Sequence, residues 1–64
     1  MRKKKTAAQV KRLPPGTDVW MVRESNGQTG QLWIVKSGRK KFLKGMFAEH
    51  RIEDRAGWHY EVEV

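Results

Sequence analysis

Residues 31–43 read QLWIVKSGRKKFL, and this stretch decides the fold because it holds two strand patterns around a turn. Residues 31–36 are rich in β-branched and aromatic side chains, which favours a strand. Ser37 and Gly38 can close a tight hairpin onto a second strand over residues 39–43. The sequence therefore predicts a hairpin whose tip and return strand are strongly basic.

Strand patterns continue on both sides of this hairpin. Residues 17–24, centred on VWMV, predict a strand, and residues 25–30 form a turn-rich loop after it. Residues 58–64 alternate apolar and polar side chains, which predicts a strand with one solvent-exposed face. Residues 49–53 fit a strand that leads through a four-residue turn into it. A short helix over residues 46–55 is the alternative, although its apolar residues match a helical stripe only partly.

Five short strands in a basic chain of 64 residues predict an all-β fold, a small SH3-like or OB-like barrel formed by residues 14–64. A chain of this length has room for one domain. Pro14, Pro15 and Gly16 break any helix that precedes the barrel. Residues 1–13 are expected to be a basic, mostly mobile arm, because a helix of one or two turns is marginal in water.

Positive charge is concentrated in two segments. The first twelve residues contain six basic and no acidic residues, residues 36–44 contain five basic ones, and acidic residues predominate after residue 45. Two clusters of one sign attract phosphate groups and release their counterions, which indicates nucleic acid as the partner. A solvated tail and a solvated hairpin are the structural alternative. The predicted nucleic-acid-binding residues are Arg2, Lys3, Lys4, Lys5, Lys11, Arg12, Lys36, Arg39, Lys40, Lys41 and Lys44.

The sheet is expected to have two apolar faces. If Glu24 pairs with Gln31 and Lys36 with Arg39, side chains divide strictly by the alternation of the strands. One face then holds Trp20, Val22, Trp33, Val35, Phe42, Lys40 and Lys44. The other holds Val19, Met21, Leu32, Ile34 and Leu43, together with Arg23, Lys36, Arg39 and Lys41.

One of these faces must line the core, and the other must be covered by the arm, by a second copy or by a ligand. Large aromatic side chains supply most of the burial in a small domain, so the aromatic face is the preferred core. In the reverse arrangement, Trp20, Trp33 and Phe42 would form a platform on which bases stack.

Catalysis and cofactor binding are not expected. The chain has no cysteine, hence no disulfide and no thiolate metal site, and it has no phosphate-binding loop motif. His50 and His59 fall at polar positions and are expected to be solvated rather than metal ligands. No apolar run exceeds four residues, so we expect neither a membrane span nor an export signal, and the lack of cysteine suits a cytoplasmic protein.

The resulting hypothesis is a non-enzymatic nucleic-acid-binding protein, with duplex DNA slightly preferred to RNA. The hairpin of residues 36–44 would dock on the sugar-phosphate backbone while the arm wraps an adjacent groove or strand. Changing Lys40 and Lys41 together to glutamate is expected to abolish binding without unfolding the domain.

The alternative is a small protein-binding module or inhibitor, of the type that mobile elements encode, which holds an acidic or enzymatic partner protein. A symmetric homo-oligomer that buries the apolar face is a related form of it.

Overall fold

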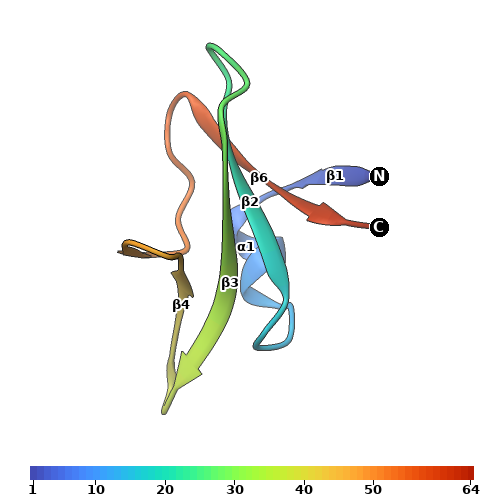
Figure 1. The fold of residues 1–64 in the computed structure, drawn as a ribbon. Helices are drawn as coiled ribbons and strands as arrows, with labels where there is room; N and C mark the ends of the chain where they lie inside the picture. The colour runs from blue at the N-terminus through green and yellow to red at the C-terminus, as the bar shows by residue number, and fades with distance from the viewer.

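Six strands form one antiparallel sheet, and a short helix packs on one face of it (Figure 1). The computed structural model describes all residues from Met1 to Val64. The elements are β1 (Arg2–Lys5), α1 (Ala7–Lys11), β2 (Asp18–Arg23), β3 (Thr29–Ser37), β4 (Lys40–Lys44), β5 (Glu49–His50) and β6 (Trp58–Glu63). The strand order is β1-β6-β2-β3-β4-β5. The all-β class is confirmed, but the predicted five-stranded barrel is not, because this six-stranded sheet stays open.

The basic N-terminal segment differs from the expected mobile arm. β1 pairs along its whole length with β6, from Arg2 opposite Glu63 to Lys5 opposite Tyr60. Thr6 then caps α1 and shares reciprocal hydrogen bonds with Gln9. A helix this short is unstable alone, and packing on the sheet stabilises it here.

The hydrophobic core lies between one face of the sheet and α1. Both α1 and the segment that joins β5 to β6 contribute side chains to it. The core residues are Ala7, Val10, Val19, Met21, Leu32, Ile34, Leu43, Ile52, Tyr60 and Val62, with Leu13 and Trp58 packed against them. The aliphatic face of β2, β3 and β4 is therefore inside, and the preferred assignment of an aromatic core is wrong.

The predicted division into two faces holds even though the predicted register does not. Gln31 pairs with Trp20 instead of Glu24, and Lys36 pairs with Lys41 instead of Arg39. These shifts are four and two residues, and an even shift leaves each side chain on its original face.

The predicted hairpin between residues 49–53 and the last strand is also wrong. β5 has only two residues and pairs with β4, while β6 pairs with β1 and β2. No strand pairs with residues 51–53, and the Tyr60 hydroxyl bonds the backbone of Glu53 instead. It donates to the Glu53 carbonyl at 2.8 Å and accepts from the Glu53 N–H at 3.1 Å. No helix forms over residues 46–55, and no helix of the protein has the length and apolar character needed to cross a membrane.

Candidate nucleic-acid interface

A two-residue turn at the tip of the β3–β4 hairpin forms one end of the molecule. Ser37 pairs with Lys40, which leaves Gly38 and Arg39 as the loop. Gly38 has a φ of 61°, and a positive φ at the first central position suits the right-handed twist of a hairpin. Figure 1 shows this turn at the bottom of the view, away from both termini, which lie together at the right-hand side.

Lys41 ties the C-terminal end of α1 to this hairpin. Its Nζ donates to the carbonyl oxygens of Lys11 at 2.9 Å and Leu13 at 2.8 Å. The contact holds Lys11 and Arg12 beside β4, although they are about thirty residues away in sequence. Those bonds satisfy carbonyl groups that a helix leaves free at its end.

Six cations from three segments therefore lie around the tip of the β3–β4 hairpin, Lys36 and Lys41 on the core face of the sheet and Lys40 on the opposite face. We call this region the basic end. None of these cations forms an ion pair with an acidic group of the protein. An unneutralised cluster of one sign produces the field that a polyanion recognises. The basic end consists of Lys11, Arg12, Lys36, Arg39, Lys40 and Lys41.

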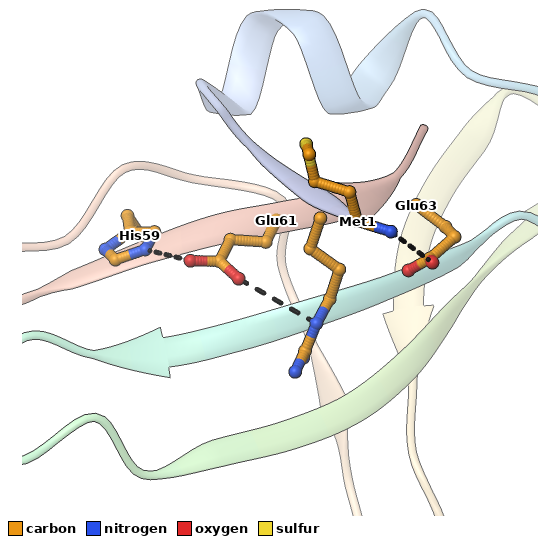
Figure 2. A network of polar contacts seen from close by, with 5 residues as sticks. Met1, His59, Glu61 and Glu63 are labelled. Atoms are coloured by element: carbon orange, nitrogen blue, oxygen red, sulfur yellow. Dashed lines mark hydrogen bonds and ion pairs between the residues drawn. The ribbon is translucent and has the colours of Figure 1, made fainter.

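The N-terminal cations lie elsewhere, and two of them are neutralised. Arg2 Nε lies 4.0 Å from Glu61, and Lys4 Nζ lies 3.7 Å from Glu24. Figure 2 shows Glu61 and Glu63 of β6 facing the first residues of the chain, with the Met1 amino group 3.0 Å from Glu63. The structure thus separates the eleven predicted residues: Arg2 to Lys5 line the β1 edge, away from the basic end.

His59 lies within the same polar network rather than in solvent. Its Nε2 is 2.8 Å from Glu61 (Figure 2). Its Nδ1 is 3.4 Å from Glu24, and its side chain is only 18% exposed. The expectation that His59 is solvated is therefore wrong. Nδ1 is buried and has no aligned hydrogen-bond partner. No group of three or more His, Asp or Glu side chains is arranged to hold a metal ion.

The face of the sheet opposite the core carries the three predicted stacking residues, and they are not equivalent. Trp20 is half-buried and has the Arg2 guanidinium 4.9 Å from its ring centre. Trp33 is 36% exposed, and Phe42 is half-buried with Lys40 Nζ 5.7 Å from its ring centre. Lys44, the remaining predicted cation, pairs opposite Trp33.

Sequence reasoning missed an exposed apolar loop between β4 and β5. Met46 is 83% exposed and Phe47 is 95% exposed, and the Gly45 N–H closes the loop on the Ala48 carbonyl at 2.8 Å. With Trp33 they line a groove beside β3. The sequence signal for this loop is the apolar pair Met46 and Phe47 directly after Gly45. The pair fits neither the period of two of a strand nor the period of 3.6 residues of a helix.

Comparison with protein-family models, with curated proteins and with solved structures finds no significant match to this chain.

Proposed function

We propose that this protein binds nucleic acid without catalysing a reaction, and that the basic end contacts the sugar-phosphate backbone. The observation that carries the proposal is the basic end itself, where three separate segments contribute six cations that no acidic side chain neutralises. Lysine and arginine that neutralise phosphates release condensed counterions, and this supplies most of sequence-independent affinity.

In this proposal the N-terminal segment does not wrap around the nucleic acid, although the sequence had suggested that it would. Its backbone is paired in the sheet, and Arg2 and Lys4 already contact acidic residues. The end of α1 instead supplies Lys11 and Arg12 next to the hairpin.

Two charge-matched triple variants test the location of the interface. Lys36→Gln with Arg39→Gln and Lys40→Gln removes one arginine and two lysines from the basic end. Arg2→Gln with Lys3→Gln and Lys4→Gln removes the same groups from the β1 edge. We expect the first variant to lose affinity for nucleic acid by on the order of 100-fold near 0.1 M salt, and the second to change it little, because exposed charges are screened beyond about 10 Å.

Fluorescence anisotropy with labelled oligonucleotides measures both affinities, and circular dichroism checks that each variant is folded. Equal losses in the two variants would mean that net charge, not the basic end, determines binding. Lack of wild-type binding at physiological salt would refute the nucleic-acid function. Lys41 is kept in both variants because it holds α1, so the glutamate pair at residues 40 and 41 does not separate binding from folding.

A second candidate function is protein binding, favoured by the exposure of Met46 and Phe47 beside the groove at Trp33. Contiguous exposed apolar surface commonly marks a protein contact. This function predicts that replacing Met46 and Phe47 with serine abolishes capture of the partner, while the triple variant of the basic end leaves capture intact.

A further inference from the structure

The sheet face opposite the core has a composition suited to a particular anionic ligand. α1 and the segment after β5 contribute their apolar side chains to the core face. The opposite face carries Trp33, the most exposed tryptophan, and Phe42 beside it. Trp33 and Phe42 are partly exposed neighbours on this face, and contiguous exposed apolar surface commonly marks an interaction site.

On this face, β4 places an aromatic ring between two cations. Lys40 and Lys44 lie two residues before and after Phe42, at a spacing of about 6.6 Å per pair of residues. Trp33 stands opposite Lys44, and Val35 stands opposite Phe42. Trp33 and Phe42 are thus diagonal neighbours, with about 7–8 Å between their Cα atoms.

This pattern requires a ligand that is anionic and also has flat, exposed faces. The bases of a duplex stack on one another and hide those faces, whereas a single strand can turn its bases onto aromatic side chains. An acidic peptide would satisfy the lysines but would leave the rings without a planar partner. Lys40 is the member of the basic end that lies on this face, so a strand whose phosphate contacts Lys40 can continue along β4 past Phe42 to Lys44.

We propose that this face binds single-stranded nucleic acid by stacking bases on Trp33 and Phe42 while Lys40 and Lys44 contact the flanking phosphates. The protein then prefers single strands to duplexes of the same length. This inference depends on the proposed nucleic-acid function and specifies its ligand. Trp20 is not part of the site, because Arg2 lies over its ring and is itself held near Glu61. Lys40 also lies over the Phe42 ring, but no acidic side chain holds it there, so it can turn toward a phosphate as a base stacks.

The test compares a labelled oligothymidylate with a labelled duplex of equal length by fluorescence anisotropy. Wild-type protein is expected to bind the single strand more tightly at the same salt. Trp33→Leu and Phe42→Leu should each weaken single-strand binding by about tenfold and leave duplex binding unchanged. Trp20→Leu is the matched control on the same face and should leave both affinities unchanged, and Trp33→Tyr should restore most of the loss.

A spectroscopic measurement separates stacking from indirect effects. The double variant Trp20→Phe and Trp58→Phe leaves Trp33 as the single tryptophan. Saturating it with oligothymidylate should quench Trp33 fluorescence strongly, whereas the duplex should quench it little.

Other results would overturn the stacking site alone or both proposals together. Equal binding of both ligands, unchanged single-strand binding by Trp33→Leu and Phe42→Leu, or an unquenched Trp33 would overturn the stacking site while the nucleic-acid function stands. Failure of folded wild-type protein to bind either ligand would overturn both proposals and favour a protein partner.

Discussion

At the scale of single residues, Lys40 and Lys41 are chemically identical neighbours with different roles. Alternation along β4 places them on opposite faces, Lys40 beside Phe42 and Lys41 against α1. Strand alternation in the sequence already predicted that they lie on opposite faces, but it could not give Lys41 a structural role. That role comes from the carbonyls of Lys11 and Leu13, which only the folded chain brings near β4.

Replacing Lys41 with methionine should therefore destabilise the protein. The change removes a charged donor from the carbonyls of Lys11 and Leu13 and should lower the free energy of unfolding by about 1–2 kcal/mol. Lys40→Met is the matched control and should stay within about 0.5 kcal/mol of wild type. Urea denaturation followed by circular dichroism measures both, and equal stabilities would contradict the assigned role of Lys41.

Tyr60→Phe should destabilise the segment between β5 and β6. The ring stays in the core, but the hydroxyl no longer donates to the Glu53 carbonyl or accepts from its N–H. We expect a loss of about 1–3 kcal/mol in unfolding free energy, because both backbone groups lose a partner. Thr17→Val removes an exposed hydroxyl bond to Pro14 and should cost less in the same denaturation experiment. A larger effect at Thr17 would contradict this account.

At the scale of elements, the strands with clear alternation were predictable and the pairings between distant strands were not. β2, β3 and β6 each contain enough apolar residues to indicate a strand, and the period of two fixed which side chains share a face. β1 has the sequence RKKK, which contains no apolar residue, so its sequence does not predict a strand. Its pairing becomes understandable only with β6 beside it, where Glu61 and Glu63 face Lys4 and Arg2.

Deleting residues 1–12 should unfold the domain rather than simply remove charge. The deletion takes β1 from the sheet and both Ala7 and Val10 from the core, and Val10 is 0% exposed. A domain of this size has little stability to lose. Thermal unfolding by circular dichroism should show no cooperative transition for the deleted chain.

The control for that deletion keeps the chain and removes charge. Lys3→Gln, Lys4→Gln and Lys5→Gln together should unfold cooperatively, near the wild-type midpoint. A deleted chain that melted with the wild-type midpoint would mean that residues 1–12 are dispensable for the fold.

At the scale of the whole molecule, the cations fall into two separate regions, the β1 edge of the sheet and the basic end. Cations at the β1 edge face the acidic residues of β6, while the basic end has no acidic neighbour in an ion pair. The sequence predicted an uneven charge distribution and the hairpin part of the candidate site. It could not predict that the helix end joins the hairpin, since that depends on how α1 packs.

The salt dependence of binding should report the number of contacts. Lys44 and the five cations of the basic end other than Lys41 would neutralise six phosphates of a single strand. This predicts a slope of about −4 for the logarithm of the binding constant against the logarithm of salt concentration. The triple variant of the basic end should reduce the slope to about −2. Anisotropy titrations across a salt series measure both slopes, and an unchanged slope in the variant would place the phosphates elsewhere.

The strand order also governs how this chain folds as it is made. β6 is the last strand in the sequence, yet it lies between β1 and β2 in the sheet. On the ribosome, β2 keeps a bare edge and β1 has no neighbour until residues 58–63 have emerged. The nascent chain can pair β2 to β5 in order, but β1 cannot join the sheet until β6 has been made. Completion of the sheet is therefore delayed until synthesis has passed residue 63, and such distant pairings favour slow folding.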